Sequence, residues 1–140
     1  MKNLLKSSDI VTVHVPVSDE TTEMINAETL KLMKSTAILI NTARAKIVNT
    51  PDLAVALRGG IIAGAGIDVH YTEPPPDDYE LLGMDNVILT PHLAWYSEEG
   101  GWDIRHMIMD DIRSLLNGGL PDNVLNPEVL DRENCKLKLM

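Results

Sequence analysis

The chain has 140 residues, of which 44% are hydrophobic and 24% are charged, and this composition fits a globular protein of one domain. Its net charge of −9 argues against a nucleic acid partner, because binding to a phosphate backbone needs a basic surface. No apolar run approaches the ~18–20 residues that a membrane span needs, so we expect no membrane partner. A small anionic ligand remains compatible, since it needs only one or two local cations and backbone N–H groups.

The cysteine content and the first residues bear on location. A single cysteine, Cys135, cannot form an internal disulfide, which favours a reducing compartment. The apolar part of residues 1–6 is too short for a signal peptide. We therefore expect a cytoplasmic protein.

Four runs of β-branched and other apolar residues predict strands. They cover residues 10–15, 36–40, 61–69 and 87–90. The first run is apolar almost throughout, so we expect it to be buried on both faces, as parallel strands are. Small residues in the third run, Gly64 and Gly66 among them, predict the close approach of a helix, another backbone or a ligand.

Helices are predicted between and after these strands. Asn26 is the expected cap of one helix, and Thr50 is the expected N-cap of the next, with Pro51 at its first position. Ser97 is the expected N-cap of a long helix whose apolar residues recur at helical spacing. Residues 4–8 are predicted to be the end of a helix, and further helices are predicted over residues 26–33, 50–58 and 97–116.

This alternation predicts an α/β fold, with a parallel sheet of about four strands and flanking helices. It corresponds to part of a Rossmann fold, because no G-x-G-x-x-G phosphate loop occurs within these residues. The only similar run, Gly64-Ala65-Gly66, leads into a strand rather than from a strand into a helix.

Polar residues follow three of the predicted strands. Asn41-Thr42-Ala43-Arg44 follows the second strand, Asp68 to Glu73 follows the third, and Thr90-Pro91-His92 ends the fourth. Ligands of open α/β sheets bind at the carboxyl ends of the strands. We therefore expect these residues to share one site.

Each of these side chains has a chemical interpretation and an ordinary one. Arg44 is suited to hold a carboxylate through two hydrogen bonds, or it forms a surface salt bridge. His92 is suited to proton transfer near neutral pH, and Glu73 to orienting that imidazole, or both are ordinary loop residues. Asp68 needs a partner, either a backbone N–H in a turn or a ligand amide. The other histidines are expected in the core (His14), in a loop (His70) and on a helix surface (His106).

Arg44, His92 and Glu73 together suit the oxidation of a 2-hydroxy acid. The histidine takes the hydroxyl proton while hydride leaves the carbon, and the imidazolium returns the proton in the reverse direction. The hydride acceptor must be a cofactor, because no side chain performs this step.

The order and spacing of these motifs resemble the carboxyl-terminal half of the cofactor domain of D-isomer-specific 2-hydroxyacid dehydrogenases. This resemblance assigns residues 1–126 to the carboxyl-terminal part of a dinucleotide-binding domain and residues 127–140 to a tail. The segment Ala94-Trp95-Tyr96-Ser97 is similar to the C-terminal-binding corepressors, an NAD-binding branch that works largely through protein contacts. The resembling segments are residues 8–16 (SDIVTVHVP), 33–44 (MKSTAILINTAR), 54–57 (AVAL), 64–69 (GAGIDV), 73–74 (EP) and 86–92 (NVILTPH).

The resemblance implies a role for each site residue. Arg44 would bind the substrate carboxylate and polarise the carbonyl, and His92 would be the acid/base, paired with Glu73. A glutamine takes the place of this glutamate in the related formate dehydrogenases. Asp68 would bind the carboxamide of a nicotinamide cofactor, NAD or NADP, and the substrate would be a small 2-hydroxy or 2-keto acid. The implied cofactor-lining residues are Val15, Pro16, Thr42 and Ala43, with Thr21 nearby and His92, Ala94 and Trp95 flanking the nicotinamide.

Two departures from the family pattern shape the expectations. Position 45 is Ala where the family usually has Gly, which would be strained if φ were positive there. The family's phosphate loop, ribose-binding acid and substrate domain have no counterpart in these residues, so we expect weak or no NAD binding and no activity from this chain alone. The alternative is a non-enzymatic interaction module or a remnant, which pairs through an exposed sheet edge with another copy or a complementing chain.

Overall fold

The computed structural model describes residues 1–122, 124–133 and 135. By their internal contacts they form two compact units, Met1–Ala94 and Trp95–Met140. Residues 134 and 136–140 of the predicted tail lie outside the described part. The first unit contains α1 (Lys2–Ser7), β1 (Ile10–Val13), α2 (Ala27–Leu30), β2 (Ile38–Asn41), the 3₁₀ helix η1 (Ala45–Ile47), α3 (Thr50–Arg58), β3 (Gly64–Ile67) and β4 (Val87–Leu89).

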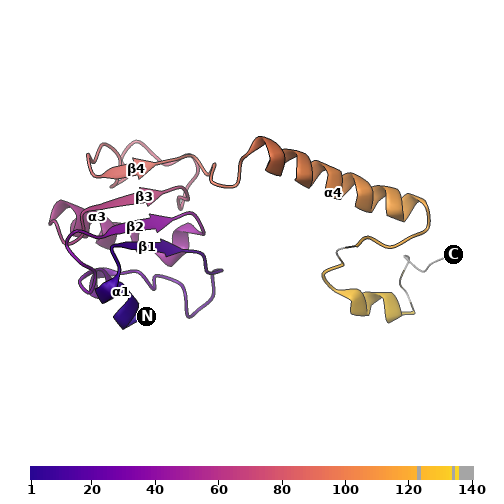
Figure 1. Ribbon diagram of the computed structural model, residues 1–140, viewed down its shortest axis with the longest axis horizontal. Coiled ribbons are helices and arrows are strands. Elements are labelled where there is room, and N and C mark those ends of the chain that lie inside the picture. Colours follow the sequence, from indigo (N-terminus) through magenta and orange to yellow (C-terminus); the bar gives the residue numbers. More distant parts are fainter. Residues whose placement is uncertain (123, 134, 136–140) are drawn as a thin grey trace. The chain divides into compact units, whose positions relative to one another are not determined.

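The four strands form one sheet in the order β1-β2-β3-β4, with every pair parallel (Figure 1). This confirms the predicted α/β fold and its strand count. The strands are shorter than predicted, and β1 ends at Val13 rather than at residue 15. Because all four strands run the same way, their carboxyl ends lie along one edge of the sheet.

Burial alternates along the strands, and only one face of the sheet is covered in the first unit. Val11, Val13 and Leu39 point into the core, whereas Ile10 is 59% exposed and Ile88 is 72% exposed. The expectation that the first strand is buried on both faces is therefore wrong. It failed because apolar composition alone does not distinguish a strand covered on both faces from one covered on a single face.

Helix caps account for where the helices begin. Asn26 caps α2 as predicted, because its side chain accepts hydrogen bonds from the backbone N–H groups of Glu28 and Thr29. Thr50 is not the N-cap of α3. Asn49 takes that role by accepting a hydrogen bond from the N–H of Asp52 at 3.0 Å, so the helix begins at Thr50, one residue earlier than predicted.

Gly64 confirms that the small residues of β3 mark a close approach. A Cβ atom at this position would lie 2.9 Å from the backbone carbonyl oxygen of Asn86. At Gly66, on the same face of the strand, the nearest atom to an added Cβ would be 4.0 Å away, in Ile40. The two glycines therefore differ, and only Gly64 is required by packing.

The second unit consists of α4 (Glu98–Leu116) and the 3₁₀ helix η2 (Pro127–Asp131), which falls in the predicted tail. Ser97 caps α4 as predicted, by accepting a hydrogen bond from the N–H of Gly100 at 2.9 Å. His106 lies exposed on this helix, as expected. None of the residues of α4 is buried.

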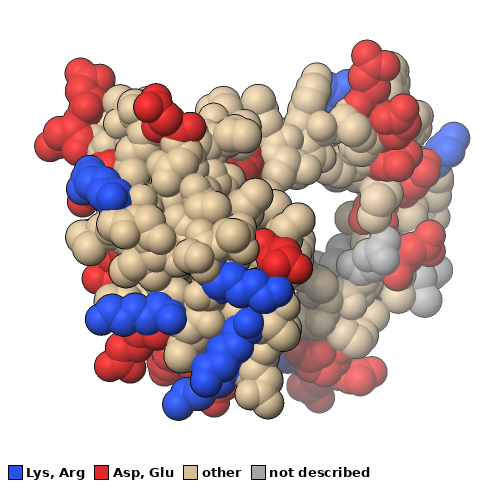
Figure 2. All heavy atoms as spheres, turned by 60° about the vertical axis from the view of Figure 1, so that its left-hand side comes forward, with Lys and Arg blue, Asp and Glu red and all other residues tan. Residues whose placement is uncertain are grey.

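Acidic side chains outnumber basic ones on the surface, as the 21 Asp and Glu against 12 Lys and Arg require. In Figure 2 the acidic side chains are scattered over the visible face, and several Lys and Arg side chains gather in the lower part of the view while others lie apart from them. Among the described residues, no helix is both long and apolar enough to cross a membrane.

Candidate active site

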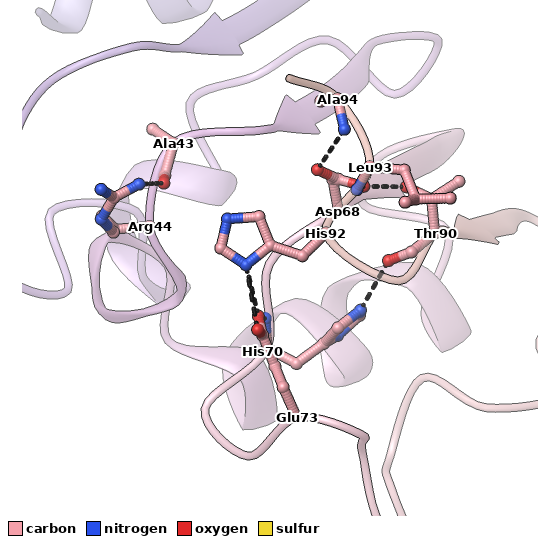
Figure 3. Close-up of polar contacts among 9 residues, drawn as sticks. All are labelled: Ala43, Arg44, Asp68, His70, Glu73, Thr90, His92, Leu93 and Ala94. Atoms are coloured by element: carbon pink, nitrogen blue, oxygen red, sulfur yellow. Dashed lines mark hydrogen bonds and ion pairs between the residues drawn. The ribbon is translucent and has the colours of Figure 1, made fainter. Parts of the chain in front are cut away.

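The predicted site residues converge at the carboxyl ends of three neighbouring strands. Arg44 follows β2 and precedes η1, Asp68 directly follows β3, and His92 lies three residues beyond β4. The register pairs Asn41 at the end of β2 with Ile67 at the end of β3. Parallel pairing therefore brings the three segments together, as the sequence predicted (Figure 3).

The central feature is a hydrogen-bonded pair of side chains, His92 and Glu73. Nδ1 of His92 lies 2.9 Å from one carboxylate oxygen of Glu73 and 3.1 Å from the other. This hydrogen bond, followed by one from the backbone N–H of His70, holds the pKa of Glu73 below its usual range. A carboxylate accepts and does not donate, so Nδ1 carries the proton that binds Glu73.

The other ring nitrogen of His92, Nε2, is available to accept a proton. Figure 3 shows that Nε2 points away from Glu73, on the side of Arg44. Nothing in the described part of the chain bonds to it. An imidazole with Nδ1–H bound to a carboxylate presents a lone pair at Nε2, which is the form that accepts a proton.

Asp68 anchors the loop that carries His92. Asp68 is 3% exposed as a residue, and its carboxylate accepts hydrogen bonds from the Thr90 hydroxyl, from the N–H of Leu93 at 2.8 Å and from the N–H of Ala94 at 2.9 Å. Burial acts to raise the pKa of Asp68, but the hydrogen bonds from Thr90, Ala94 and Leu93 outweigh it, so the pKa is lowered. Of the two partners that the sequence left open for Asp68, the structure supplies backbone N–H groups.

The backbone of His92 is in the left-handed region, with φ of 56°. Residues other than glycine rarely adopt this conformation, and such positions cluster at functional sites. It is held here because the N–H of His92 donates to the backbone carbonyl of Asp68 at 2.9 Å. The same turn directs the next two N–H groups onto the carboxylate of Asp68.

Arg44 is held by Asn41, a buried residue at the end of β2. The Asn41 side chain accepts from the N–H of Ala43 at 3.1 Å and donates to the carbonyl of Arg44 at 3.0 Å. The guanidinium donates to the carbonyl of Ala43 at 2.7 Å, and its other donors can bind a ligand. Ala45 is not strained, because its φ is not positive and it is the first residue of η1.

Two cavities adjoin at this edge, and both are lined by Arg44 and Val17. The smaller cavity, of about 200 Å³, is also lined by Lys46, Glu73 and His92. The larger one, of about 440 Å³, is lined by His14, Val15, Pro16, Val17, Thr42, Ala43 and Arg44. A cavity lined by the charged side chains of Arg44, Lys46 and Glu73 thus borders one that is lined by apolar and hydroxyl groups.

Thr21 supports one edge of the larger cavity without lining it. Its hydroxyl donates to the carbonyl of Pro16 at 2.7 Å and accepts from the N–H of Ser18 at 2.7 Å. It therefore holds the Val15-Pro16 edge in place. Ala94 belongs to the Asp68 network, whereas Trp95 begins the second unit, where its ring packs edge-to-face on Tyr96.

One histidine was placed wrongly by the sequence. His14 is exposed beside the larger cavity rather than in the core, because β1 ends one residue before it. His70 lies in a loop, as predicted, but it is buried there, with both ring nitrogens bonded. Val17 and Lys46 were also missed, since nothing in their local pattern distinguishes them from loop residues.

Comparison with known proteins identifies the family. Residues 1–94 match the model of the D-isomer specific 2-hydroxyacid dehydrogenase NAD-binding domain. The chain belongs to the D-isomer specific 2-hydroxyacid dehydrogenase family. The predicted recognition is thereby confirmed.

Relatives and solved structures of this dehydrogenase family agree with the match. The chain is 44% identical over 130 residues to a glyoxylate reductase of Korarchaeum cryptofilum, covering 93% of this chain and 39% of the relative. It is 43% identical over 127 residues to a glycerate dehydrogenase of Methylorubrum extorquens, covering 89% and 40%.

Among structures, the NAD-complexed D-isomer specific 2-hydroxyacid dehydrogenase of Lactobacillus delbrueckii ssp. bulgaricus superposes with a TM-score of 0.83 at 36% identity, covering 89% of this chain and 42% of that one. The D-lactate dehydrogenase of Lactobacillus jensenii with NAD⁺ also gives 0.83, at 34% identity, covering 89% and 41%. The chain thus spans about two fifths of the length of these relatives.

Proposed function

We propose that this chain supplies the catalytic groups of an NAD- or NADP-dependent 2-hydroxyacid dehydrogenase, which interconverts a small 2-hydroxy acid and its 2-keto acid. The observation that carries the proposal is the His92–Glu73 pair, with Nδ1 of His92 2.9 Å from the carboxylate, beside a cavity that Arg44 lines. A bound nicotinamide supplies the hydride acceptor, which no side chain provides.

Each residue then has one task. Arg44 holds the substrate carboxylate through its guanidinium N–H groups and polarises the carbonyl. Nε2 of His92 takes the hydroxyl proton during oxidation and returns it to the keto oxygen during reduction. Glu73 fixes the tautomer and stabilises the imidazolium that forms. Lys46, on the wall of the same cavity, adds a second local cation for an anionic substrate.

The larger cavity is the proposed cofactor site. Val15, Pro16, Thr42 and Ala43 line it, and Thr21 keeps its edge in place. Asp68 has about four acceptor positions on its carboxylate, of which three are used, so one remains for a carboxamide N–H. Ala94 and Trp95 complete the proposed set with His92.

We further propose that the isolated chain binds NAD weakly and has no activity alone. No G-x-G-x-x-G run is present in its 140 residues, so the usual pyrophosphate site at a helix N-terminus is not among them. Micromolar binding of NAD to this chain in titration calorimetry would refute the proposal. We assign residues 1–126 to the dinucleotide-binding domain and the protein to the cytoplasm.

A chimera tests the catalytic assignment directly. Residues 1–126 replace the matching segment of the Korarchaeum cryptofilum glyoxylate reductase, which is 44% identical over 130 residues. We expect NADH oxidation by glyoxylate, followed at 340 nm. His92→Asn should lower kcat by about 10²–10⁴-fold, because general acid–base catalysis contributes that much. A folded His92→Asn chimera with unchanged kcat would contradict the assignment.

Arg44→Lys in the same chimera separates binding from chemistry. Lysine keeps the charge but loses the fork of donors that matches a carboxylate, so we expect KM for glyoxylate to rise more than kcat falls. Lys2→Arg, on exposed α1, is the matched control and should leave both constants unchanged.

A second candidate is an interaction module, and the exposed sheet supports it. β1 lies at the end of the strand order, and Ile10, Ile38 and Ile88 are exposed on one face. An unpaired strand edge favours pairing with another strand. Under this proposal the chain is a homo-oligomer or joins a complementing chain. Size-exclusion chromatography with light scattering tests it, and a strictly monomeric chain that captures no complementing fragment would contradict it.

A further inference from the structure

His70 lines the same smaller cavity as His92 and Glu73 and is 8% exposed. Its Nε2 is 3.0 Å from the backbone carbonyl oxygen of Thr90, and its Nδ1 is 3.3 Å from the hydroxyl of Tyr79. A carbonyl oxygen only accepts hydrogen bonds, so Nε2 must carry a proton. In the neutral ring Nδ1 is then the acceptor for the hydroxyl of Tyr79, which gives the Nε2–H tautomer.

This residue connects the two segments from which the pair comes. Its backbone N–H donates to Glu73 at 3.1 Å, on the carboxylate that binds His92. Its ring holds the carbonyl of Thr90, two residues before His92, at the point where β4 has ended. Figure 3 shows His70 between these two attachments.

Packing alone would not require a histidine here. The ring of His70 meets the ring of Tyr79 edge-to-face, with centroids 5.4 Å apart, and a phenylalanine would make the same contact. Among the residues that the structure describes, the Thr90 carbonyl accepts a side-chain hydrogen bond from Nε2 of His70 alone. The hydrogen bond, not the ring, is therefore the specific contribution of this side chain.

We propose that His70 is a positioning residue, which holds the end of β4 through Nε2–H and the carboxylate of Glu73 through its backbone N–H. In this way His92 keeps its proton on Nδ1 and its lone pair on Nε2. The catalytic meaning of this arrangement rests on the proposed dehydrogenase function, but the arrangement itself does not. The two histidines are thereby held as opposite tautomers, Nε2–H at His70 and Nδ1–H at His92.

The first experiment needs no variant. The full chain, labelled with ¹⁵N, is examined by long-range ¹H–¹⁵N correlation NMR at about pH 9, where imidazoles of ordinary pKa near ~6.5 are neutral. We expect the Nε2–H pattern for His70 and the Nδ1–H pattern for His92. Finding His70 as the Nδ1–H tautomer, or both residues as the same tautomer, would overturn the proposal.

Three variants then separate positioning from packing. In His70→Phe the ratio of Nδ1–H to Nε2–H at His92 should fall about fivefold, as expected for losing one hydrogen bond. In His70→Gln the amide N–H can replace Nε2–H, so the ratio should stay near that of the wild type. Tyr79→Phe keeps the bond to Thr90 and should also leave the ratio nearly unchanged.

Every result of these experiments either supports or overturns the proposal. An unchanged His92 ratio in folded His70→Phe, or an equal fall in His70→Gln, would overturn the proposal. If His70→Phe fails to fold, the wild-type tautomers and His70→Gln decide. These signals require no substrate or cofactor, so an inactive chimera with the expected tautomers would refute the proposed function and leave the role of His70 intact.

Discussion

Asp68→Asn removes the charge at the centre of the loop that carries His92 and changes the size of the side chain very little. The carboxylate accepts three hydrogen bonds, two of them from the backbone N–H groups of Leu93 and Ala94. Asparagine keeps one acceptor oxygen, so one of those N–H groups would face an NH₂ group. A bond to a charged group contributes about 1.5–3 kcal/mol and an unsatisfied buried donor costs about 1–3 kcal/mol, so we expect a loss of about 2–4 kcal/mol.

Urea denaturation measures this loss. With a slope of about 2 kcal/mol per molar urea, the midpoint should fall by about 1–2 M. Asp85→Asn makes the same charge change at an exposed position near β4 and should shift the free energy of unfolding by less than about 0.5 kcal/mol. If the two variants unfold at the same urea concentration, the Asp68 network does not contribute as the geometry implies.

The pH dependence supplies an independent check on the same variant. The pKa of Asp68 is lowered from 3.8 in the folded chain, so the unfolded chain binds its proton at a higher pH than the folded chain does. The stabilisation is therefore complete above about pH 5 and is lost as the pH falls through the folded pKa. The difference between wild type and Asp68→Asn should be constant from pH 5 to 8 and should narrow below about pH 4. A difference that does not narrow would refute the reasoning.

Two further predictions concern the backbone. Gly64→Ala should destabilise the chain by about 1–3 kcal/mol in urea denaturation, because the new Cβ would lie 2.9 Å from a backbone carbonyl oxygen. Gly66→Ala, two residues along the same strand, should change stability by less than about 0.5 kcal/mol, and equal losses for both would count against the packing argument. At position 92 φ is 56°, a backbone conformation that glycine adopts more readily than alanine. The His92→Gly variant should therefore be more stable than the His92→Ala variant by about 1 kcal/mol. The urea midpoints of His92→Gly and His92→Ala compare them, and a more stable alanine variant would contradict the left-handed turn.

The meeting of the candidate site residues at one sheet edge could be predicted from the sequence, because it follows from the parallel topology of the strands. Once residues 41–44, 68–73 and 90–92 are assigned to successive strand ends, their meeting at one edge follows without any knowledge of side chains. The same reasoning gave the fold class and the strand count. The His92–Glu73 contact follows from the family resemblance, and the structure adds which ring nitrogen makes it.

What the sequence could not supply are features decided by competition between neighbours. Asn49 and Thr50 are both good caps, and only the hydrogen bond to the N–H of Asp52 shows which one begins α3. His14 and His70 each follow an apolar run, yet one is exposed and the other is buried. Local pattern does not record how far a strand extends before the chain turns, and that distance decides the environment of both histidines.

The proposed enzyme has two requirements, the geometry of the acid/base pair and the binding of the cofactor, and they depend on different parts of the structure. Arg44, Glu73 and His92 are held by contacts that all lie within Met1–Ala94, through Asn41, His70 and Asp68 in turn. None of those contacts involves the exposed face of the sheet. Covering that face, whether by another copy or by a complementing chain, should therefore raise stability and cofactor affinity without changing the geometry of the acid/base pair. The tautomer of His92 measures the acid/base pair and titration with NAD measures cofactor binding, so a complementing chain should raise the affinity for NAD and leave the tautomer of His92 unchanged.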